Sequence, residues 1–419
     1  MTENIAQALT ETPRMQAIVD VVAARDVHGP GVFVVGGTVR DILLGEKGAD
    51  IDLAVEGDAI SFAYVLADAL GGRVTPHPTF GTAIVSYAES ERIDVVTTRR
   101  ESYQSPGALP TVEHAELAHD LQRRDFTMNA MAASLGPDDL GSLFDPYGGR
   151  VDLENGAVGV LHDGSFVDDP TRILRGITYE ARYGFRFDEH TEALARTCIS
   201  SGRVGDLSSS RLRDELVALL EDPGAPDGIR RLGELGVDSA IHPHLRGDDD
   251  AAALFARSTA LRDELGLDVP SWRLGLAALA RAMTGDECSD WLDRLKVSRR
   301  HADLIVGTVA WAPRIVERLR SEPLDPAGVV ALADPFAPDA PLVALALEDR
   351  RELRDYFERL RNVRLEIGGA DLIALGVPES PQVGRILAAI RTRKLNGELD
   401  GREAELAAAR ELVAASTPA

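Results

Sequence analysis

The stretch Val32-Phe-Val-Val-Gly-Gly-Thr-Val-Arg-Asp41, followed by Asp50-Ile-Asp-Leu53, decides the fold of this chain. Its first four residues are an apolar run and predict a strand, and Thr38 to Leu44 predicts a helix. Gly36 and Gly37 then lie in the turn between them, with their backbone N–H groups facing the helix N-terminus. Exposed amides and the helix dipole favour an anion there, which suits a phosphate, although a plain tight turn is the alternative. The G-x-G-x-x-G pattern of dinucleotide-binding folds is not satisfied.

Carboxylates follow this turn on predicted strands. Asp50 and Asp52 stand at i and i+2 of a strand, so both carboxylates point to one face. Two like charges so close are unfavourable unless a cation lies between them, and oxygen ligands suit Mg²⁺. Asp94, in the alternating run Arg92 to Thr97, can supply a third carboxylate from a neighbouring strand. Three carboxylates beside a Gly-Gly turn are typical of metal-assisted phosphoryl or nucleotidyl transfer, whereas an acidic pair alone is often only an exposed strand end.

A second motif, Arg123-Arg-Asp-Phe-Thr-Met-Asn-Ala130, places two arginines and an aspartate before an apolar stretch. Guanidinium groups suit a triphosphate, and an aspartate or asparagine suits ribose hydroxyls. Consecutive arginines beside an aspartate also occur at solvated helix ends.

A third motif is Ser165-Phe-Val-Asp-Asp-Pro-Thr-Arg-Ile-Leu-Arg175. Pro170 suits the first turn of a helix, so Asp169 and Arg172 share a face that Arg175 continues. A helix cap with an i,i+3 ion pair explains this pattern without a ligand. Base recognition is the alternative, because a carboxylate accepts from an exocyclic amine while a guanidinium donates to the adjacent ring nitrogen. Cytosine and adenine present that edge, whereas uracil and guanine present the opposite polarity.

Composition limits the class of protein. The chain has 419 residues, a formal net charge of −23 and only two cysteines, so two to four domains without a disulfide framework are expected. The acidic balance argues weakly against nucleic-acid binding, because a local basic track can lie on an acidic surface. No apolar run reaches the ~18–20 residues of a membrane span, and the N-terminus does not resemble a secretory signal. We therefore expect a soluble, cytoplasmic protein.

The two parts of the chain differ in pattern. From Val32 to about Leu153, short β-type runs alternate with turns and helical stretches, whereas from about Phe166 onward Ala, Leu, Arg and Glu recur with helical spacing. This predicts an α/β head followed by an all-helical remainder.

In this order and spacing, the motifs resemble the class II tRNA nucleotidyltransferase and bacterial poly(A) polymerase family. Asp145-Pro-Tyr-Gly-Gly149 and Ser210-Arg-Leu-Arg-Asp-Glu215 add to the resemblance, which is firm from about Val32 to Pro223. It implies an α/β nucleotidyltransferase head with a mixed β-sheet, followed by an all-α neck, body and tail. The corresponding divisions are 1–155 for the catalytic head, 156–222 for the neck with base recognition, 223–325 for the body and 326–419 for the tail.

The resemblance also implies roles for single residues. Asp50 and Asp52 would hold Mg²⁺, and with Asp94 they are the candidate catalytic carboxylates. The candidate nucleotide-binding residues are Gly36, Gly37, Arg40, Arg124, Asp125, Asp169, Arg172 and Arg175. Thr178 stands where the family often has a third arginine, which leaves one phosphate or nucleotide contact open, with Arg182 nearby.

The implied activity is Mg²⁺-dependent addition of C, C and A to the 3′ end of tRNA from CTP and ATP. A poly(A) polymerase, or an enzyme that adds only CC or only A, shares every motif; the segment between Arg99 and Arg123 holds a loop that differs between these activities. A catalytically silent RNA-binding homologue is the alternative of another class. The residues Arg385, Arg391, Arg393 and Lys394 could form a basic track for the tRNA acceptor end, or only a solvated face.

Overall fold

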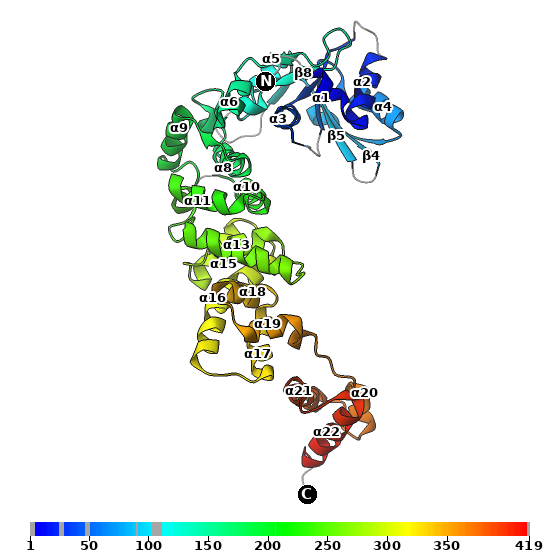
Figure 1. The fold of residues 1–419 in the computed structure, drawn as a ribbon, viewed down its shortest axis with the longest axis vertical. Coiled ribbons are helices and arrows are strands. Elements are labelled where there is room, and N and C mark those ends of the chain that lie inside the picture. The colour runs from blue at the N-terminus through cyan, green and yellow to red at the C-terminus, as the bar shows by residue number, and fades with distance from the viewer. Residues whose placement is uncertain are drawn as a thin grey trace. The chain divides into compact units, whose positions relative to one another are not determined.

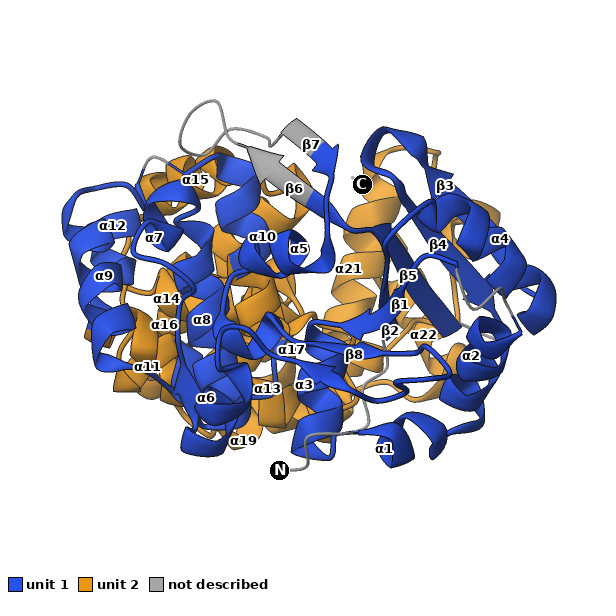
Figure 2. Cartoon of the chain, turned by 90° about the horizontal axis from the view of Figure 1, so that it is seen from above, with its two compact units in different colours: residues 1–215, 222–228, 235–241 blue, residues 216–221, 229–234, 242–419 orange. Residues whose placement is uncertain are grey.

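The computed structural model describes residues 5–24, 29–46, 51–88, 91–102, 111–205 and 207–416. The chain divides into two compact units, shown in different colours in Figure 2. The first unit comprises Met1–Glu215, Asp222–Gly228 and Leu235–Ile241, and the second comprises Leu216–Glu221, Ile229–Glu234 and His242–Ala419.

A seven-stranded mixed sheet is the framework of the first unit (Figure 1). Its order is β3-β4-β5-β2-β1-β8-β9, in which β2 and β5 are parallel and the other neighbours are antiparallel. The strands are β1 (Val32–Val35), β2 (Ile51–Val55), β3 (Arg73–His77), β4 (Thr82–Tyr87), β5 (Glu91–Thr97), β8 (Ala132–Ser134) and β9 (Leu143–Phe144). The predicted mixed sheet of the head is therefore confirmed.

The helices of the first unit lie before, between and after these strands. They are α1 (Ala6–Thr10), α2 (Pro13–Ala23), α3 (Gly37–Leu44), α4 (Ala59–Leu70), α5 (Leu117–Gln122), α6 (Gly149–Asn155), α7 (Ser165–Asp168), α8 (Thr171–Tyr183), α9 (Glu189–Ser200) and α12 (Val237–Ile241). Two further helices, α10 (Ser209–Glu221) and α11 (Ala225–Leu235), are divided between the units. Two small sheets complete the unit: β6 (Arg99–Ser102) with β7 (Thr111–His114), and β10 (Ala157–Val158) with β11 (Arg186–Phe187). The pairing of β11 is a short departure from the predicted all-helical remainder.

Side chains along β2 and β5 point alternately to a buried face and to a polar face of the sheet. Leu53 and Ile93 are fully buried, and α4 contacts the same strands. Asp52 pairs in register with Asp94, so both acidic side chains lie on the opposite face. The sheet thus presents carboxylates on the face that also carries Val35, the last residue of β1.

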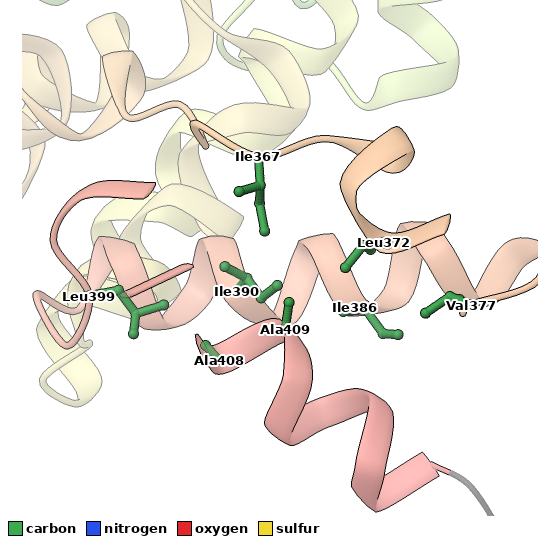
Figure 3. Close-up of a cluster of buried hydrophobic side chains, with 8 residues drawn as sticks. All are labelled: Ile367, Leu372, Val377, Ile386, Ile390, Leu399, Ala408 and Ala409. Carbon is green, nitrogen blue, oxygen red and sulfur yellow. The ribbon is translucent and has the colours of Figure 1, made fainter. Parts of the chain in front are cut away.

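The second unit is helical in its described residues. Its further helices are α13 (Asp249–Glu264), α14 (Ser271–Leu279), α15 (Gly285–Arg294), α16 (Arg299–Ser321), α17 (Pro326–Ala333), α18 (Asp339–Leu347), α19 (Arg351–Glu358), α20 (Gly369–Ala374), α21 (Pro381–Leu395) and α22 (Gly401–Ser416). The last three enclose a cluster of buried apolar side chains (Figure 3), which includes Leu372, Ile390 and Ala409, each fully buried. The predicted helical remainder is confirmed, while its division at 222 and 325 stays a prediction.

In the part of the chain that the structure describes, no single helix is long and apolar enough to cross a membrane. The segments Pro326–Phe336 and Asp339–Leu347 reach that size only as a pair bent by 113°.

Candidate active site

A cavity of about 680 Å³ in the first unit collects most of the predicted site residues. Its size is that of a small-molecule site. Six arginines and four aspartates line it, so its walls carry a net positive charge in a chain whose formal net charge is −23. The lining residues are Val35, Gly37, Thr38, Arg40, Asp41, Asp52, Val96, Arg123, Arg124, Asp125, Asn129, Asp169, Arg172, Arg175, Tyr179 and Arg182. Such a cavity suits a polyanion.

The glycine turn lies at the N-terminus of α3, as predicted. Gly36 has φ 65° and ψ −131°, which side chains of L residues rarely adopt. A Cβ atom on Gly36 would lie 2.3 Å from Nη1 of Arg124, and one on Gly37 would lie 3.2 Å from Nη2 of Arg40. The missing side chains therefore allow two guanidinium groups to approach the helix N-terminus, where an anion is favoured.

The predicted carboxylates are only partly described. Asp52 lines the cavity, and its backbone N–H donates to the Thr38 hydroxyl at 2.9 Å, which ties β2 to α3. Asp94 lies beside Asp52 on β5, as predicted, but Nε and Nη2 of Arg92 donate to its carboxylate at 3.0 and 2.9 Å. Asp50 lies outside the described residues. Among the residues whose placement is described, no group of three metal-ligating side chains is found.

The oxygen-only donor set nevertheless fits Mg²⁺, because the Asp52 carboxylate and the Thr38 hydroxyl both line the cavity and the sequence places Asp50 two residues before Asp52.

The second motif forms a tight polar cluster. Arg123 and Arg124 both donate to Asp120, a fully buried residue of α5. Asp125 is 5% exposed; its Oδ1 accepts from Nδ2 of Asn129 at 3.0 Å, and its Oδ2 lies 2.7 Å from Nη2 of Arg175. The predicted sugar-binding carboxylate is thus held between two side chains that also line the cavity.

Arg40 lies against two aromatic rings of α8. Its guanidinium carbon is 5.2 Å from the ring centre of Tyr179 and 5.0 Å from that of Tyr183. Nη1 donates to Asn129 at 2.7 Å and Nε donates to Asp41 at 2.9 Å. Burial alone would lower the pKa of Arg40, but the Asp41 carboxylate and the two tyrosines raise it, so the side chain stays a fixed cation.

The base-recognition candidates pair with other residues rather than with each other. Oδ1 of Asp169 accepts from the backbone N–H and the hydroxyl of Thr171, and its Oδ2 accepts from Arg211 at 2.5 Å. Arg172 is 7% exposed and donates to the Ser165 hydroxyl at 2.7 Å and to the Arg123 carbonyl at 2.9 Å. The Asp169–Arg172 ion pair of the explanation without a ligand is therefore not formed, while both side chains line the cavity.

Several lining residues were not among the predicted ones. Tyr179 and Arg182 follow Arg175 by four and seven positions, so the helical period could have found them. Arg182 lies within 2.6 Å of Asp222 and lines the cavity, in the stretch where Thr178 leaves an arginine missing. Thr178 itself donates to the Leu174 carbonyl within α8. Asp120 precedes Arg123 and Arg124 by three and four positions, so the helical period could have found it too. Arg211 carries no local signal, because it binds Asp169, 42 positions away.

Comparison with protein families agrees with this geometry. Residues 32–159 match the poly A polymerase head domain, and residues 184–247 match a domain described as the probable RNA and SrmB-binding site of polymerase A. The head match covers the sheet, the glycine turn and the arginine motif.

Three relatives illustrate the similarity. The A-adding tRNA nucleotidyltransferase of Halalkalibacterium halodurans is 32% identical over 91% of this chain and 88% of its own length. That of Geobacter sulfurreducens is 35% identical over 90% of this chain, which spans 44% of the relative's length. The solved Thermotoga maritima CCA-adding enzyme in complex with tRNA is 30% identical with a TM-score of 0.80, over 98% of both chains.

Other relatives are CC-adding and CCA-adding enzymes. The sheet, the cavity and these similarities together place the chain in the tRNA nucleotidyltransferase family, whose members add A, CC or CCA.

Proposed function

We propose that this chain adds C, C and A to the 3′ end of tRNA from CTP and ATP, releasing pyrophosphate. The observation that carries the proposal is a single cavity that combines the glycine turn, Asp52, Asp169 and six arginines, of which Arg172 is one. Under this proposal residues 1–155 carry catalysis, residues 156–222 recognise the base, and residues 223–325 and 326–419 serve the tRNA.

The cavity suits each part of a nucleoside triphosphate. Arg124 and Arg40 flank the Gly36–Gly37 turn, so cations and backbone amides face the same space, as phosphates require. Asp52 and Asp50 would hold Mg²⁺, which neutralises charge that develops on the α-phosphate and on pyrophosphate. The remaining contribution of the protein is to position the two substrates and to stabilise charge, without a covalent intermediate.

The base would be read by side chains that are held before the nucleotide arrives. Arg211 and Thr171 hold Asp169, and Ser165 and the Arg123 carbonyl hold Arg172. A carboxylate and a guanidinium fixed in this way match the amine and ring-nitrogen edge shared by cytosine and adenine.

A second candidate is addition of the terminal A alone. It is favoured by two relatives that are 32% and 35% identical over about nine tenths of this chain, both A-adding enzymes, compared with 29% for a CCA-adding enzyme of Geobacillus. The site is compatible with either activity, because CTP and ATP present the same edge. The loop that the sequence linked to this difference includes residues 103–110, which lie outside the described residues.

Product length on three primers separates these activities. Full CCA addition extends tRNA lacking its CCA end by three nucleotides when CTP and ATP are both supplied. An A-only enzyme extends only tRNA ending in CC, by one nucleotide, and a CC-only enzyme stops after two. Long A tails on unrelated RNA indicate a poly(A) polymerase, and no extension of any primer, with Mg²⁺ present, overturns the proposal.

The second unit offers a site for the RNA backbone, which differs from the predicted basic track. Arg393 and Lys394 are paired with glutamates, and Arg385 lines a separate hollow. Arg391 instead joins Arg361 and Arg364 in a cavity that also contains Asp334, Tyr356, Asn362, Val363 and Leu365.

The charge of this second cavity is largely uncompensated. Arg361 lies over the Phe357 ring, and Arg364 donates to the carbonyls of residues 361 and 363. Arg391 lies 3.6 Å from Asp334. We propose that this arginine cluster (Arg361, Arg364 and Arg391) contacts phosphates of the tRNA.

A further inference from the structure

One fully buried carboxylate holds both arginines of the second motif. Oδ1 of Asp120 accepts from Nε and Nη2 of Arg123 at 3.0 and 2.8 Å, and Oδ2 accepts from Nη2 of Arg124 at 3.1 Å. Asp120 is 0% exposed, and the Arg123 and Arg124 side chains are only 21% and 16% exposed. Oδ1 also accepts from the backbone N–H of Arg99 at 3.4 Å. Each oxygen therefore binds a guanidinium group that lines the cavity, while Asp120 itself does not line it.

The electrostatics favour a charged carboxylate at this position. Burial alone would raise the pKa of the Asp120 carboxyl, but the charges of Arg123 and Arg124 and their hydrogen bonds hold this pKa below its usual value. A single negative charge compensates two positive ones, so the cluster keeps one net positive charge. Without Asp120, the guanidinium groups of two consecutive residues would repel each other at close range in a poorly solvated place.

The hydrogen bonds to Asp120 also fix the orientation of each guanidinium group. With Nη2 of Arg124 bound to Asp120, its Nη1 lies over the glycine turn, 2.3 Å from the place of a Cβ atom on Gly36. The backbone carbonyl of Arg123 accepts a hydrogen bond from Arg172, so the backbone at Arg123 also limits where the side chain of the base-recognition arginine lies. Asp120 thus acts at the junction between the glycine turn and α8.

We propose that Asp120 is a positioning residue, which fixes Arg123 and Arg124 so that they bind the phosphates of the incoming nucleotide. This inference rests on the proposed function, because it takes the phosphates of CTP or ATP as the ligand of the cavity. Asp120 does not touch the nucleotide; its effect passes through the two guanidinium groups. The competing explanation is that Asp120 only stabilises the fold by forming buried ion pairs with the two arginines.

A matched variant in the second unit separates these explanations. Asp339 is 1% exposed and is bound by two nitrogens of Arg273, so Asp339→Asn also breaks a buried aspartate–arginine pair, but one whose residues do not line this cavity. Both Asp120→Asn and Asp339→Asn are expected to lower the melting temperature. Only Asp120→Asn should weaken binding of inorganic pyrophosphate and raise the KM for ATP, each by about tenfold or more, because fixed charge-assisted hydrogen bonds to phosphate are lost.

The experiment measures pyrophosphate binding by calorimetry and ATP kinetics on tRNA ending in CC, below the melting temperature of each variant. The double variant Arg123→Gln/Arg124→Gln tests whether the effect of Asp120 passes through these two arginines. If it does, adding Asp120→Asn to the double variant should weaken pyrophosphate binding by less than a further factor of two. If Asp120→Asn does not fold, Asp120→Glu takes its place, because it keeps the charge and displaces the carboxylate.

Wild-type pyrophosphate affinity in the Asp120 variant, or equal weakening in the Asp339 variant, overturns the positioning role. Failure of the wild-type protein to extend any tRNA overturns the proposed function instead, so the two failures are distinguishable.

Discussion

At the scale of single residues, Asp52 tests the chemistry of the site. Asp52→Ala should abolish nucleotide addition, because charge neutralisation by a bound metal stabilises the transition state by several kcal/mol. Asp58→Ala is the matched control: Asp58 caps α4 through the N–H groups of Ile60 and Ser61, so its loss should cost about 1 kcal/mol of stability and leave turnover unchanged. Single-turnover extension of tRNA ending in CC gives the result, and near-normal turnover of the Asp52 variant with Mg²⁺ present contradicts the assignment.

Asp169 tests base recognition at the same scale. Asp169→Ala removes the carboxylate that would face the carbonyl of UTP or GTP, so UTP incorporation should rise relative to CTP. Each wrong contact costs about 1–3 kcal/mol, which corresponds to roughly five- to 150-fold selectivity per contact. The measurement is kcat/KM for CTP, ATP, UTP and GTP beside a melting curve.

The structure also supplies a control for Asp169. Asp188 caps α9 by accepting from the Thr191 N–H at 2.7 Å, so Asp188→Ala removes a similar contact in the same unit. Unchanged nucleotide ratios in the Asp169 variant, with a fall in melting temperature like that of the Asp188 variant, mean that Asp169 serves only as a helix-terminal contact.

At the scale of elements, the two ends of α3 provide a paired test. Gly36 and Gly45 both have positive φ, 65° and 73°. Alanine should cost about 1–2 kcal/mol of backbone strain at Gly45, which is left-handed helical, and more at Gly36, whose ψ of −131° lies outside that region. A Cβ atom on Gly36 would also collide with Arg124, whereas one on Gly45 would meet nothing within 4 Å. Gly36→Ala should therefore raise the KM for ATP about tenfold or more, and Gly45→Ala should not. Equal KM values in the two variants would contradict a phosphate site at this turn.

Helix α10 carries Glu215, a titratable residue whose charge interacts with those of the site residues Arg175 and Asp169. Burial raises the pKa of the Glu215 carboxyl to about 7; the charges of Asp169 and Asp125 add to this rise, and those of Arg175 and Arg211 oppose it. Because a glutamate in the unfolded chain titrates near 4.3, the folded protein holds an extra proton between about pH 5 and pH 7. The contribution of Glu215 to stability therefore falls as pH rises through that window.

Melting curves between pH 5 and pH 8 test this dependence. Glu215→Gln should make the melting temperature less dependent on pH, and it should be more stable than the wild type above about pH 7, because the variant has no buried charge to ionise. Parallel pH profiles of the two proteins would show that Glu215 does not titrate in this range.

At the scale of the whole molecule, the arginine cluster of the second unit tests binding of tRNA. Arg361→Gln/Arg364→Gln should raise the KM for tRNA and leave that for ATP unchanged. Removing each phosphate contact should also reduce the slope of log affinity against log salt by about one. Arg393→Gln is the control, because Glu398 and Glu411 already neutralise that side chain. Unaltered salt dependence in the double variant would remove this surface from the tRNA site.

Features that depend on local geometry follow from the sequence alone. The strand Val32–Val35, the glycine turn and the helix after it follow from residue type and period, and the structure has them within one residue of the prediction. Arg172 and Arg175 lie on α8, as the 3.6-residue period predicts, whereas Asp169 lies before this helix, with extended backbone between α7 and the N-cap Pro170. Chain order and motif spacing were enough to indicate the family, which the comparisons confirm.

The partner of each charged group, in contrast, depends on how distant elements pack together. Asp169 is held by Arg211, 42 positions away, rather than by Arg172, and Arg40 lies against rings of α8, about 140 positions away. Period and propensity describe the direction of a side chain on its own element, but the atoms that it meets depend on strand order and helix packing. In this chain those long-range contacts bring arginines and aspartates from separate elements into one positively charged cavity.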